Sequence, residues 1–144
     1  MQPFSFEQLC WRLGFKPNFK DSQTKGRYGE WLAARYLKSI GYRLLFKNWR
    51  SFRDRRFEID LICFDKEILV FVEVKTRSEN SLVTGYGSMT RRKRNALECS
   101  FKSFLNESSQ NYSFYRFDLV EVDLCSKSYA EPKIYHHENI AIFR

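Results

Sequence analysis

Alternating apolar and polar positions predict a set of β-strands through the middle of the chain. Strands are expected at 42–48, 57–64, 68–76 and 114–124, with one or two more over 133–143. The second and third of these carry apolar side chains on both faces and are separated by a short polar stretch at Lys66-Glu67. This pattern predicts an antiparallel hairpin in the centre of a sheet, covered on both sides.

Three helices are predicted around these strands, at 5–13, 24–40 and 89–107. In the second helix, apolar and small residues recur at the helical period and define one buried face, which includes Gly26 and Gly29. Two glycines on a buried face predict that another backbone packs very close to this helix. Glu30 lies at the rim of the same face. The order of elements predicts an α/β fold with a mixed central sheet flanked by helices.

The expected hairpin brings charged residues together on strands that are otherwise apolar. A turn at Lys66-Glu67 pairs residues whose numbers sum to 133, so Asp60 opposes Glu73 and Glu58 opposes Lys75. Directly opposed residues have Cβ atoms about 4.5–5.5 Å apart. Two carboxylates would therefore meet on a buried strand pair, where each disfavours ionisation of the other.

Two interpretations of this acid pair stay open. A structural ion pair between Glu73 and Lys75 is common and contributes little on a surface, but it does not explain Asp60. A divalent metal explains both acids, because Mg²⁺ is typically held by one or two carboxylates together with waters and phosphate oxygens. Lys75 would then orient or help deprotonate a water and offset charge that develops during phosphodiester hydrolysis.

The charge balance indicates an anionic partner. The chain has 25 Lys and Arg residues against 17 Asp and Glu residues, a formal net charge of +8, and such an excess favours nucleic acid. Lys93 also shares the helical stripe of Leu97 and Phe101, so we expect it to point toward the core or a cleft. The candidate nucleic-acid contacts are Arg91, Arg92, Lys93 and Arg94 in the densest basic run, followed by Arg53, Arg55 and Arg56 before the hairpin.

Other features favour a cytoplasmic protein without a zinc site. The four cysteines, at positions 10, 63, 99 and 125, are far apart and form no C-x-x-C pair, so we expect reduced thiols. The sequence contains no apolar run of 18 residues, which is the length expected of a membrane-spanning helix. The first residues also lack the pattern of a signal peptide.

Several short motifs, taken in order, resemble the PD-(D/E)XK nuclease superfamily. They are "GRYGE" (26–30), "EIDLI" (58–62), "FVEVKTR" (71–77), Lys93, "RFD" (116–118) and "YHHENIAIF" (135–143). More closely, the set is similar to the YraN-like family of uncharacterised bacterial proteins, which resemble archaeal Holliday-junction resolvases. The resemblance covers about residues 24–143. It implies a restriction-endonuclease-like domain at 24–144, preceded by an N-terminal extension with a short helix at 1–23.

The resemblance also implies roles for the matching residues. Asp60 and Glu73 would bind the metal with the backbone carbonyl of Val74, Lys75 would be the catalytic lysine, and Glu30 would be the acid of the first helix in the domain. Phe57 stands where the family usually has Gly, a departure that bears on the local turn and leaves the acids in place.

Together these observations predict an endonuclease dependent on Mg²⁺ or Mn²⁺ that hydrolyses phosphodiester bonds in DNA, with branched or recombination-intermediate DNA as a candidate substrate. One alternative is a non-catalytic nucleic-acid-binding module on the same fold. Another is an interaction protein that docks a partner through its N-terminal helix. DNA is the expected partner, no membrane association is expected, and a homodimer is left open.

Overall fold

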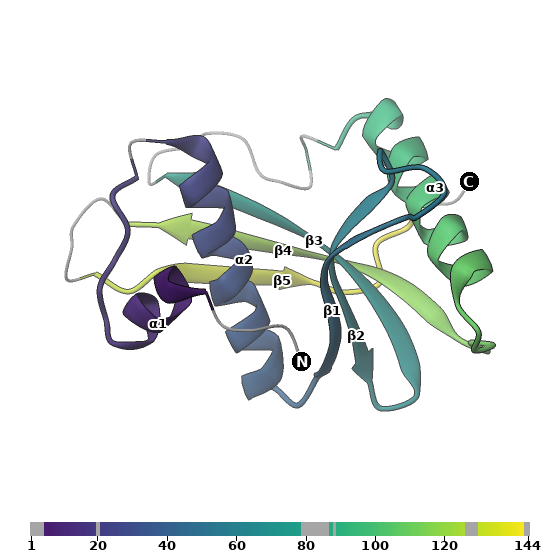
Figure 1. The fold of residues 1–144 in the computed structure, drawn as a ribbon, viewed down its shortest axis with the longest axis horizontal. Helices are drawn as coiled ribbons and strands as arrows, with labels where there is room; N and C mark the ends of the chain where they lie inside the picture. Colours follow the sequence, from purple (N-terminus) through teal and green to yellow (C-terminus); the bar gives the residue numbers. More distant parts are fainter. Residues whose placement is uncertain (1–4, 20, 79–86, 88, 126–129, 143–144) are drawn as a thin grey trace.

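The computed structural model describes residues 5–19, 21–78, 87, 89–125 and 130–142, which form a five-stranded sheet flanked by helices (Figure 1). This arrangement confirms the expected α/β class and is consistent with a restriction-endonuclease-like fold. The elements in chain order are α1 Phe6–Arg12, α2 Ser22–Ser39, β1 Arg43–Arg50, β2 Glu58–Asp65, β3 Ile68–Ser78, α3 Arg91–Glu107, β4 Tyr115–Leu124 and β5 Lys133–His137.

The strands lie in the order β1-β2-β3-β4-β5. Neighbouring strands are antiparallel except β3 and β4, which are parallel and are connected in the chain through α3. A parallel pair requires such a crossover, whereas a hairpin needs only a tight turn. The β2–β3 hairpin pairs Asp65 with Ile68 and continues to Leu61 with Val72, which is the predicted register. Its turn residue Lys66 has a φ of 54°.

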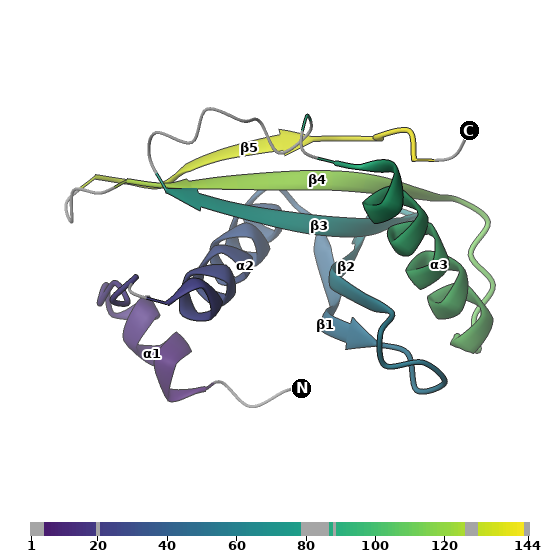
Figure 2. The same cartoon turned by 90° about the horizontal axis from the view of Figure 1, so that it is seen from above.

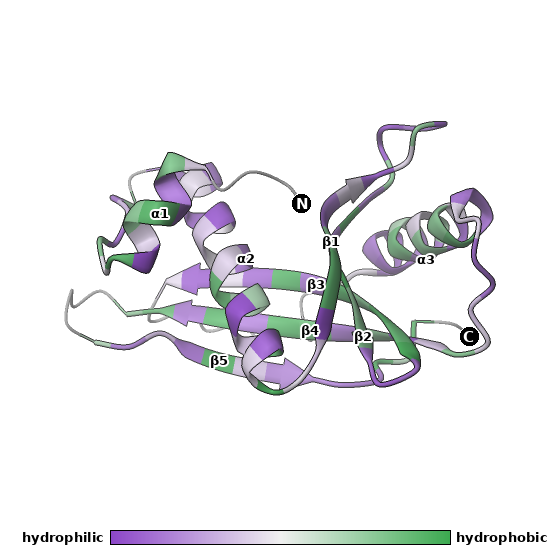
Figure 3. Cartoon of the chain, turned by 60° about the horizontal axis from the view of Figure 1, so that its bottom comes forward, coloured by the Kyte–Doolittle hydropathy of each residue, from purple (hydrophilic) through white to green (hydrophobic). Residues whose placement is uncertain are grey.

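Hydrophobic side chains pack on both sides of the hairpin, as expected, and form two clusters. On one side Leu61 and Val72 pack with Leu37 of α2. On the other side the ring of Phe71 stacks on Phe101 of α3, with ring centroids 4.4 Å apart. Figure 2 shows β1 and β2 running between α2 and α3. Figure 3 shows hydrophobic stretches along β3 and β4, and hydrophilic colour over much of the connection between β1 and β2.

Several element ends differ from the sequence prediction. Helix α2 begins at Ser22 rather than residue 24, because the Asp21 carboxylate accepts hydrogen bonds from the backbone N–H groups of Gln23 and Thr24. Strand β5 ends at His137, and residues 138–142 contain no strand. Of the one or two strands predicted over 133–143, the structure contains one within the residues that it describes.

The predicted close approach to α2 occurs at one of the two glycines. A Cβ built on Gly29 would lie 1.7 Å from Oγ1 of Thr76 in β3, whereas a Cβ on Gly26 would meet nothing within 4 Å. Gly29 therefore allows α2 to lie directly on β3. The next residue of the helix, Glu30, is held beside the sheet as a result.

Helix α1 packs against the start of α2. Ser5 caps it by accepting a hydrogen bond from the backbone N–H of Gln8. Trp11 is buried against Tyr28 and Trp31, with ring centroids 5.2 and 5.7 Å away. Among the described helices, none combines the length and apolar character needed to cross a membrane.

Candidate functional site

Asp60 and Glu73 come together where the ladder between β2 and β3 ends. Beyond the Leu61–Val72 pair, Oδ2 of Asp60 accepts a hydrogen bond of 2.7 Å from the backbone N–H of Val74. The Asp60 carboxylate thus accepts a hydrogen bond that a backbone carbonyl of β2 would accept if the ladder continued. Burial, and after it the negative charge of Glu73, raise the pKa of Asp60 to about 7. The two acids therefore interact strongly, as the hairpin register predicts.

Two lysines hold the second acid. Nζ of Lys75 lies 2.7 Å from Oε1 of Glu73, and Nζ of Lys93 lies 2.8 Å from the same oxygen. Burial by itself would lower the pKa of Lys93, but the charge and hydrogen bond of Glu73 outweigh it and raise that pKa. The Glu73 side chain is only 6% exposed. Lys93 thus points from α3 toward the sheet, on the inward side that its helical stripe predicts.

The expected pairing of Glu58 with Lys75 is wrong. Glu58 lies opposite Arg50 of β1 and forms an ion pair with it. The reason is that only residues 61–65 of β2 pair with β3. The first residues of β2, from Glu58, pair with β1 alone. The same parting places Ile59 in the hydrophobic cluster beside α3, although strict alternation puts it on the face of Leu61.

Glu30 joins the cluster from α2. It is half-buried, and its pKa is raised by burial first and then by the negative charges of Glu58 and Glu73, against a hydrogen bond from Asn48 that lowers it. Helix α2 and strand β1 therefore supply a third acid and its hydrogen-bond partner. The participation of Asn48 is not predicted by the sequence pattern, in which it is an ordinary polar residue of a strand.

The donors of this cluster fit a hard divalent cation, although they are not arranged as a ready metal site. Within the described residues, no group of three or more His, Cys, Asp and Glu side chains is placed to hold a metal ion. Asp60, which is half-buried, and Glu73, which is buried, do offer two carboxylates whose mutual repulsion a cation would relieve. Two carboxylates suffice for Mg²⁺ when water and substrate oxygens complete its shell. The backbone carbonyl of Val74 stays a predicted ligand.

The other predicted basic residues lie at the two ends of α3. Arg91 and Arg92 are exposed in its first turn, and Arg94 is half-buried there. The connection that carries Arg53, Arg55 and Arg56 lies near the other end, because Ser51 donates a hydrogen bond to Glu107 in the last turn. A helix of 17 residues is about 25 Å long. The two basic groups are therefore separate surfaces. Figure 2 shows the connection between β1 and β2 beside the C-terminal end of α3.

Helix α1 borders the site, which the sequence pattern does not predict. A hollow of about 220 Å³ is lined by Gln8 and Trp11 of α1, by Glu30 of α2, and by Lys47 and Asn48 of β1, among other residues. The N-terminal segment thus forms one wall of the space into which Glu30 faces.

A second polar cluster, around Arg116 of the "RFD" motif, stabilises the fold. Its guanidinium donates to Asp118 and Asp65, each at 2.9 Å, and to the hydroxyl of Tyr42. Burial by itself would raise the pKa of Asp118, but hydrogen bonds from His136 and Arg116 outweigh it and hold that pKa below its ordinary value. The cluster ties β4 to the β2–β3 turn and to β5. Its sequence signal is Arg and Asp two apart on a strand, which face the same side.

Asp60, Glu73, Lys75 and Lys93, with Glu30 at the edge, form what we call the acid–lysine cluster. The fold and this cluster define the class: an α/β protein with a restriction-endonuclease-like sheet whose central strands carry two acids and a lysine, joined by a second lysine from α3. The chain belongs to the uncharacterised protein family UPF0102, whose sequence profile matches residues 29–122. This membership confirms the YraN-like resemblance. Helix α1 precedes the matched residues.

Relatives from several organisms match most of the chain. It is 35% identical over 119 residues to the UPF0102 protein of Sulfurihydrogenibium sp. (strain YO3AOP1), which covers 83% of this chain and 95% of that one. The UPF0102 protein of Alkaliphilus oremlandii is 39% identical over 116 residues, covering 79% and 94% of the two chains. That of Herpetosiphon aurantiacus is 33% identical over 126 residues, covering 85% and 97%. None of these names states an activity.

Proposed function

We propose that the protein is a metal-dependent endonuclease that hydrolyses phosphodiester bonds in DNA, with branched or recombination-intermediate DNA as the first substrates to test. The observation that carries the proposal is the meeting of Asp60 and Glu73 at the end of the β2–β3 ladder, beside two lysines. Burial and the charge of Glu73 raise the pKa of Asp60 to about 7. Such a pair is stabilised by a bound cation.

The chain's own residues would divide the work as follows. Asp60 and Glu73, with the Val74 carbonyl, would hold Mg²⁺ or Mn²⁺, which when bound acts as a Lewis acid on phosphate oxygens and lowers the pKa of water. Lys75 carries its charge beside Glu73, where it would orient the attacking water and stabilise the negative charge that develops on the phosphate. Glu30 would place a third carboxylate at the edge of the same site.

One observation favours the non-catalytic alternative, a nucleic-acid-binding module. Oε1 of Glu73 already accepts from both Lys75 and Lys93. A buried acid that is paired and hydrogen-bonded in this way is stable without a metal. The same cluster could then hold α3 against the sheet while basic residues elsewhere contact the nucleic acid.

A nuclease assay separates the two functions. Duplex, flap and four-way DNA would be incubated with the protein in Mg²⁺, in Mn²⁺ and in EDTA. We expect metal-dependent cleavage by the parent protein and a loss of at least about 100-fold in Lys75→Ala. Lys102→Ala is the matched control, because Lys102 also pairs with a glutamate, Glu98, but on the exposed side of α3. Salt-sensitive binding without any cleavage would favour the binding module.

A further inference from the structure

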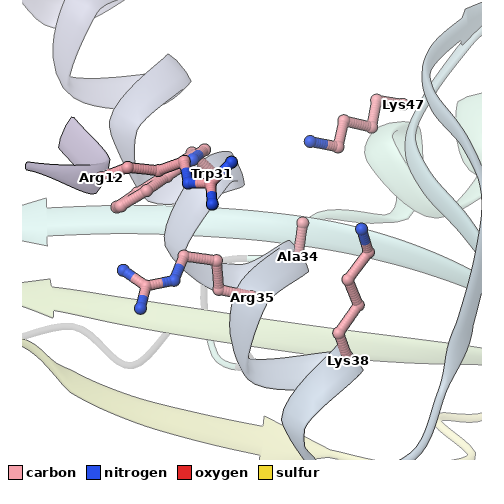
Figure 4. A pocket seen from close by; sticks show the side chains of 6 residues that line it. All are labelled: Arg12, Trp31, Ala34, Arg35, Lys38 and Lys47. Atoms are coloured by element: carbon pink, nitrogen blue, oxygen red, sulfur yellow. The ribbon is translucent and has the colours of Figure 1, made fainter. Parts of the chain in front are cut away.

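A second hollow, distinct from the acid–lysine cluster, is strongly basic. It has a volume of about 440 Å³ and is lined by Arg12 of α1, by Trp31, Ala34, Arg35 and Lys38 of α2, and by Lys47 of β1 (Figure 4). Its volume lies in the range of small-ligand sites. Four of these six side chains are cations, and none of the described residues that line it is acidic. We call it the basic pocket.

The two lysines of the basic pocket are held toward each other. Figure 4 shows the ammonium groups of Lys38 and Lys47 directed from α2 and β1 into the space above Ala34. Lys47 is half-buried, and its pKa is lowered by burial first and then by the positive charge of Lys38. The dipole of α2 favours Lys38, which lies in its last turn, and the negative charge of Glu30 offsets part of the lowering at Lys47. An anion between the two ammonium groups would stabilise both.

The floor of the basic pocket is aromatic but is not open for stacking. Trp31 is 5% exposed. Its ring is stacked with Tyr28 at 5.7 Å, and the guanidinium of Arg35 lies 4.7 Å from its centre. Stacking of a nucleic-acid base requires an accessible ring face. The pocket therefore presents charge rather than a base-binding platform, and the ligand it suits is a phosphate group.

The basic pocket adjoins a smaller hollow at the Glu30 edge of the acid–lysine cluster. Trp31 and Lys47 line both the basic pocket and the smaller hollow that contains Glu30 and Asn48. A strand with a phosphate between Lys38 and Lys47 would therefore have its neighbouring nucleotides directed toward Glu30.

We propose that the basic pocket binds backbone phosphates of a nucleic-acid strand and so holds that strand beside the acid–lysine cluster. The identity of the polyanion rests on the proposed function. Recognition here would be independent of base sequence, because the lining cations contact phosphate and not base edges. The pocket also gives α1 a role, since this helix lies outside the family match and supplies Arg12 to the pocket wall.

A salt series tests the proposal with two matched double variants. Binding of labelled duplexes of two unrelated sequences would be measured in EDTA for the parent, for Lys38→Gln/Lys47→Gln, and for Lys66→Gln/Lys133→Gln. The second pair removes the same charge from exposed lysines of the β2–β3 turn and of β5. We expect the pocket variant to lower the magnitude of the log K against log[salt] slope by up to about 1.8, at about 0.9 per phosphate. The effect should be equal for both sequences, and the control should stay near the parent.

Lysine acetylation of the parent, read by mass spectrometry, gives a test that needs no variant. Bound DNA should protect Lys38 and Lys47 and leave Lys66 and Lys133 as reactive as in the free protein. Absence of DNA binding, equal slopes for the two double variants, or unprotected pocket lysines would each overturn the proposal. If DNA binds and protects the pocket lysines but is never cut, the basic-pocket proposal stands and the proposed nuclease function is wrong. Cleavage with an unchanged slope overturns the basic pocket alone.

Discussion

Gly29 of α2 and Thr76 of β3 lie so close that no side chain fits between them: a Cβ on Gly29 would be 1.7 Å from Oγ1 of Thr76. Each is the chain neighbour of a candidate site residue, Glu30 in the helix and Lys75 in the strand. The contact therefore fixes the distance between α2, which carries Glu30, and β3, which carries Glu73 and Lys75.

Replacing Gly29 should separate these two elements. We expect Gly29→Ala to lower the free energy of unfolding by about 2 kcal/mol or more, because overpacking of this severity forces a backbone shift. The natural control is Gly26→Ala, one turn earlier in the same helix, where an added Cβ meets nothing within 4 Å. That change should be neutral or stabilising by up to about 1 kcal/mol. Urea unfolding of both variants measures the difference.

A second change at the contact shows whether Thr76 is the cause. Thr76→Ala removes the nearest atom, Oγ1, and leaves its own Cβ 2.8 Å from the methyl group added at Gly29. We expect the Gly29→Ala/Thr76→Ala double variant to recover about 1 kcal/mol of the loss, seen as a coupling energy in a double-mutant cycle. Strict additivity of the two changes would mean that α2 does not rest on Thr76.

Asp60 should make stability depend on pH. Because burial and then the Glu73 charge raise its pKa to about 7, the folded protein binds more protons than the unfolded chain between about pH 4 and 7. The free energy of unfolding therefore falls as the pH rises through this window. In EDTA, Asp60→Asn should be more stable than the parent at pH 8, by an amount on the order of 1–4 kcal/mol.

The pH dependence of that gain is the decisive part. It should become small near pH 4, where Asp60 is protonated in the folded state and about half protonated in the unfolded chain. Asp123→Asn, on β4 and outside the cluster, is the matched control and should show no gain that grows with pH. A gain for Asp60→Asn that is the same at pH 4 and pH 8 would assign the effect to packing instead of charge.

A divalent cation should reverse the penalty of placing the two acids together. We expect Mn²⁺ to raise the melting temperature of the parent at pH 8, since a ligand at 100 times its Kd stabilises by about 2.7 kcal/mol. Calorimetric titration should show a site that both Asp60→Asn and Glu73→Gln abolish and that Glu98→Gln retains. Parent-like binding by either cluster variant would exclude that acid as a ligand.

The fold was predictable because hydrophobic periodicity determines it. The alternation over 57–64 and 68–76 determines the hairpin, and its register follows from the position of Lys66-Glu67. That register also brings Asp60 near Glu73. The sequence pattern does not predict that the start of β2, before Leu61, separates from β3. There Glu58 and Ile59 pair with β1, and this tertiary pairing has no local sequence pattern.

The site residues that the sequence pattern does not predict come from elements that are distant from one another in the chain. Lys47 and Arg12 are ordinary surface cations by pattern, and only the packing of α1 and β1 against α2 brings them into one pocket. The helical stripe of Lys93, the second lysine on Glu73, predicts that its side chain points toward the core or a cleft, but the stripe does not identify its partner. Periodicity determines which face a residue occupies, and it does not determine which element lies opposite that face.

Lys75 should matter for chemistry more than for affinity. We expect Lys75→Ala to bind DNA within a few-fold of the parent while cleavage is lost, because the lysine acts on the water or on the transition state. Lys93→Ala removes the other ammonium on the same oxygen of Glu73 and is the matched comparison. It should retain more activity than Lys75→Ala. Equal losses of affinity and rate in Lys75→Ala would make it a simple phosphate contact.

Arg91 and Arg92 should contribute to DNA binding at the cost of helix stability. Both are exposed in the first turn of α3, where the helix dipole disfavours cations by a few tenths of a kcal/mol each. Arg91→Gln/Arg92→Gln should therefore raise the melting temperature slightly. It should also weaken DNA binding equally for all sequences and lower the salt slope by up to about 1.8. Arg94 is left in place because it is half-buried there.

The comparison for this pair is Arg53→Gln/Arg55→Gln, which removes the same charge near the opposite end of α3. Anisotropy titrations of both double variants over the same salt range decide between the two surfaces, because a helix of 17 residues separates them by about 25 Å. A reduced slope in the first pair alone places DNA at the start of α3, on the side of Lys93 and Glu73. A reduced slope in the second pair alone places it at the β1–β2 connection. That result would contradict the expectation, because the phosphates would then lie near the last turn of α3, at the opposite end of the helix from Lys93.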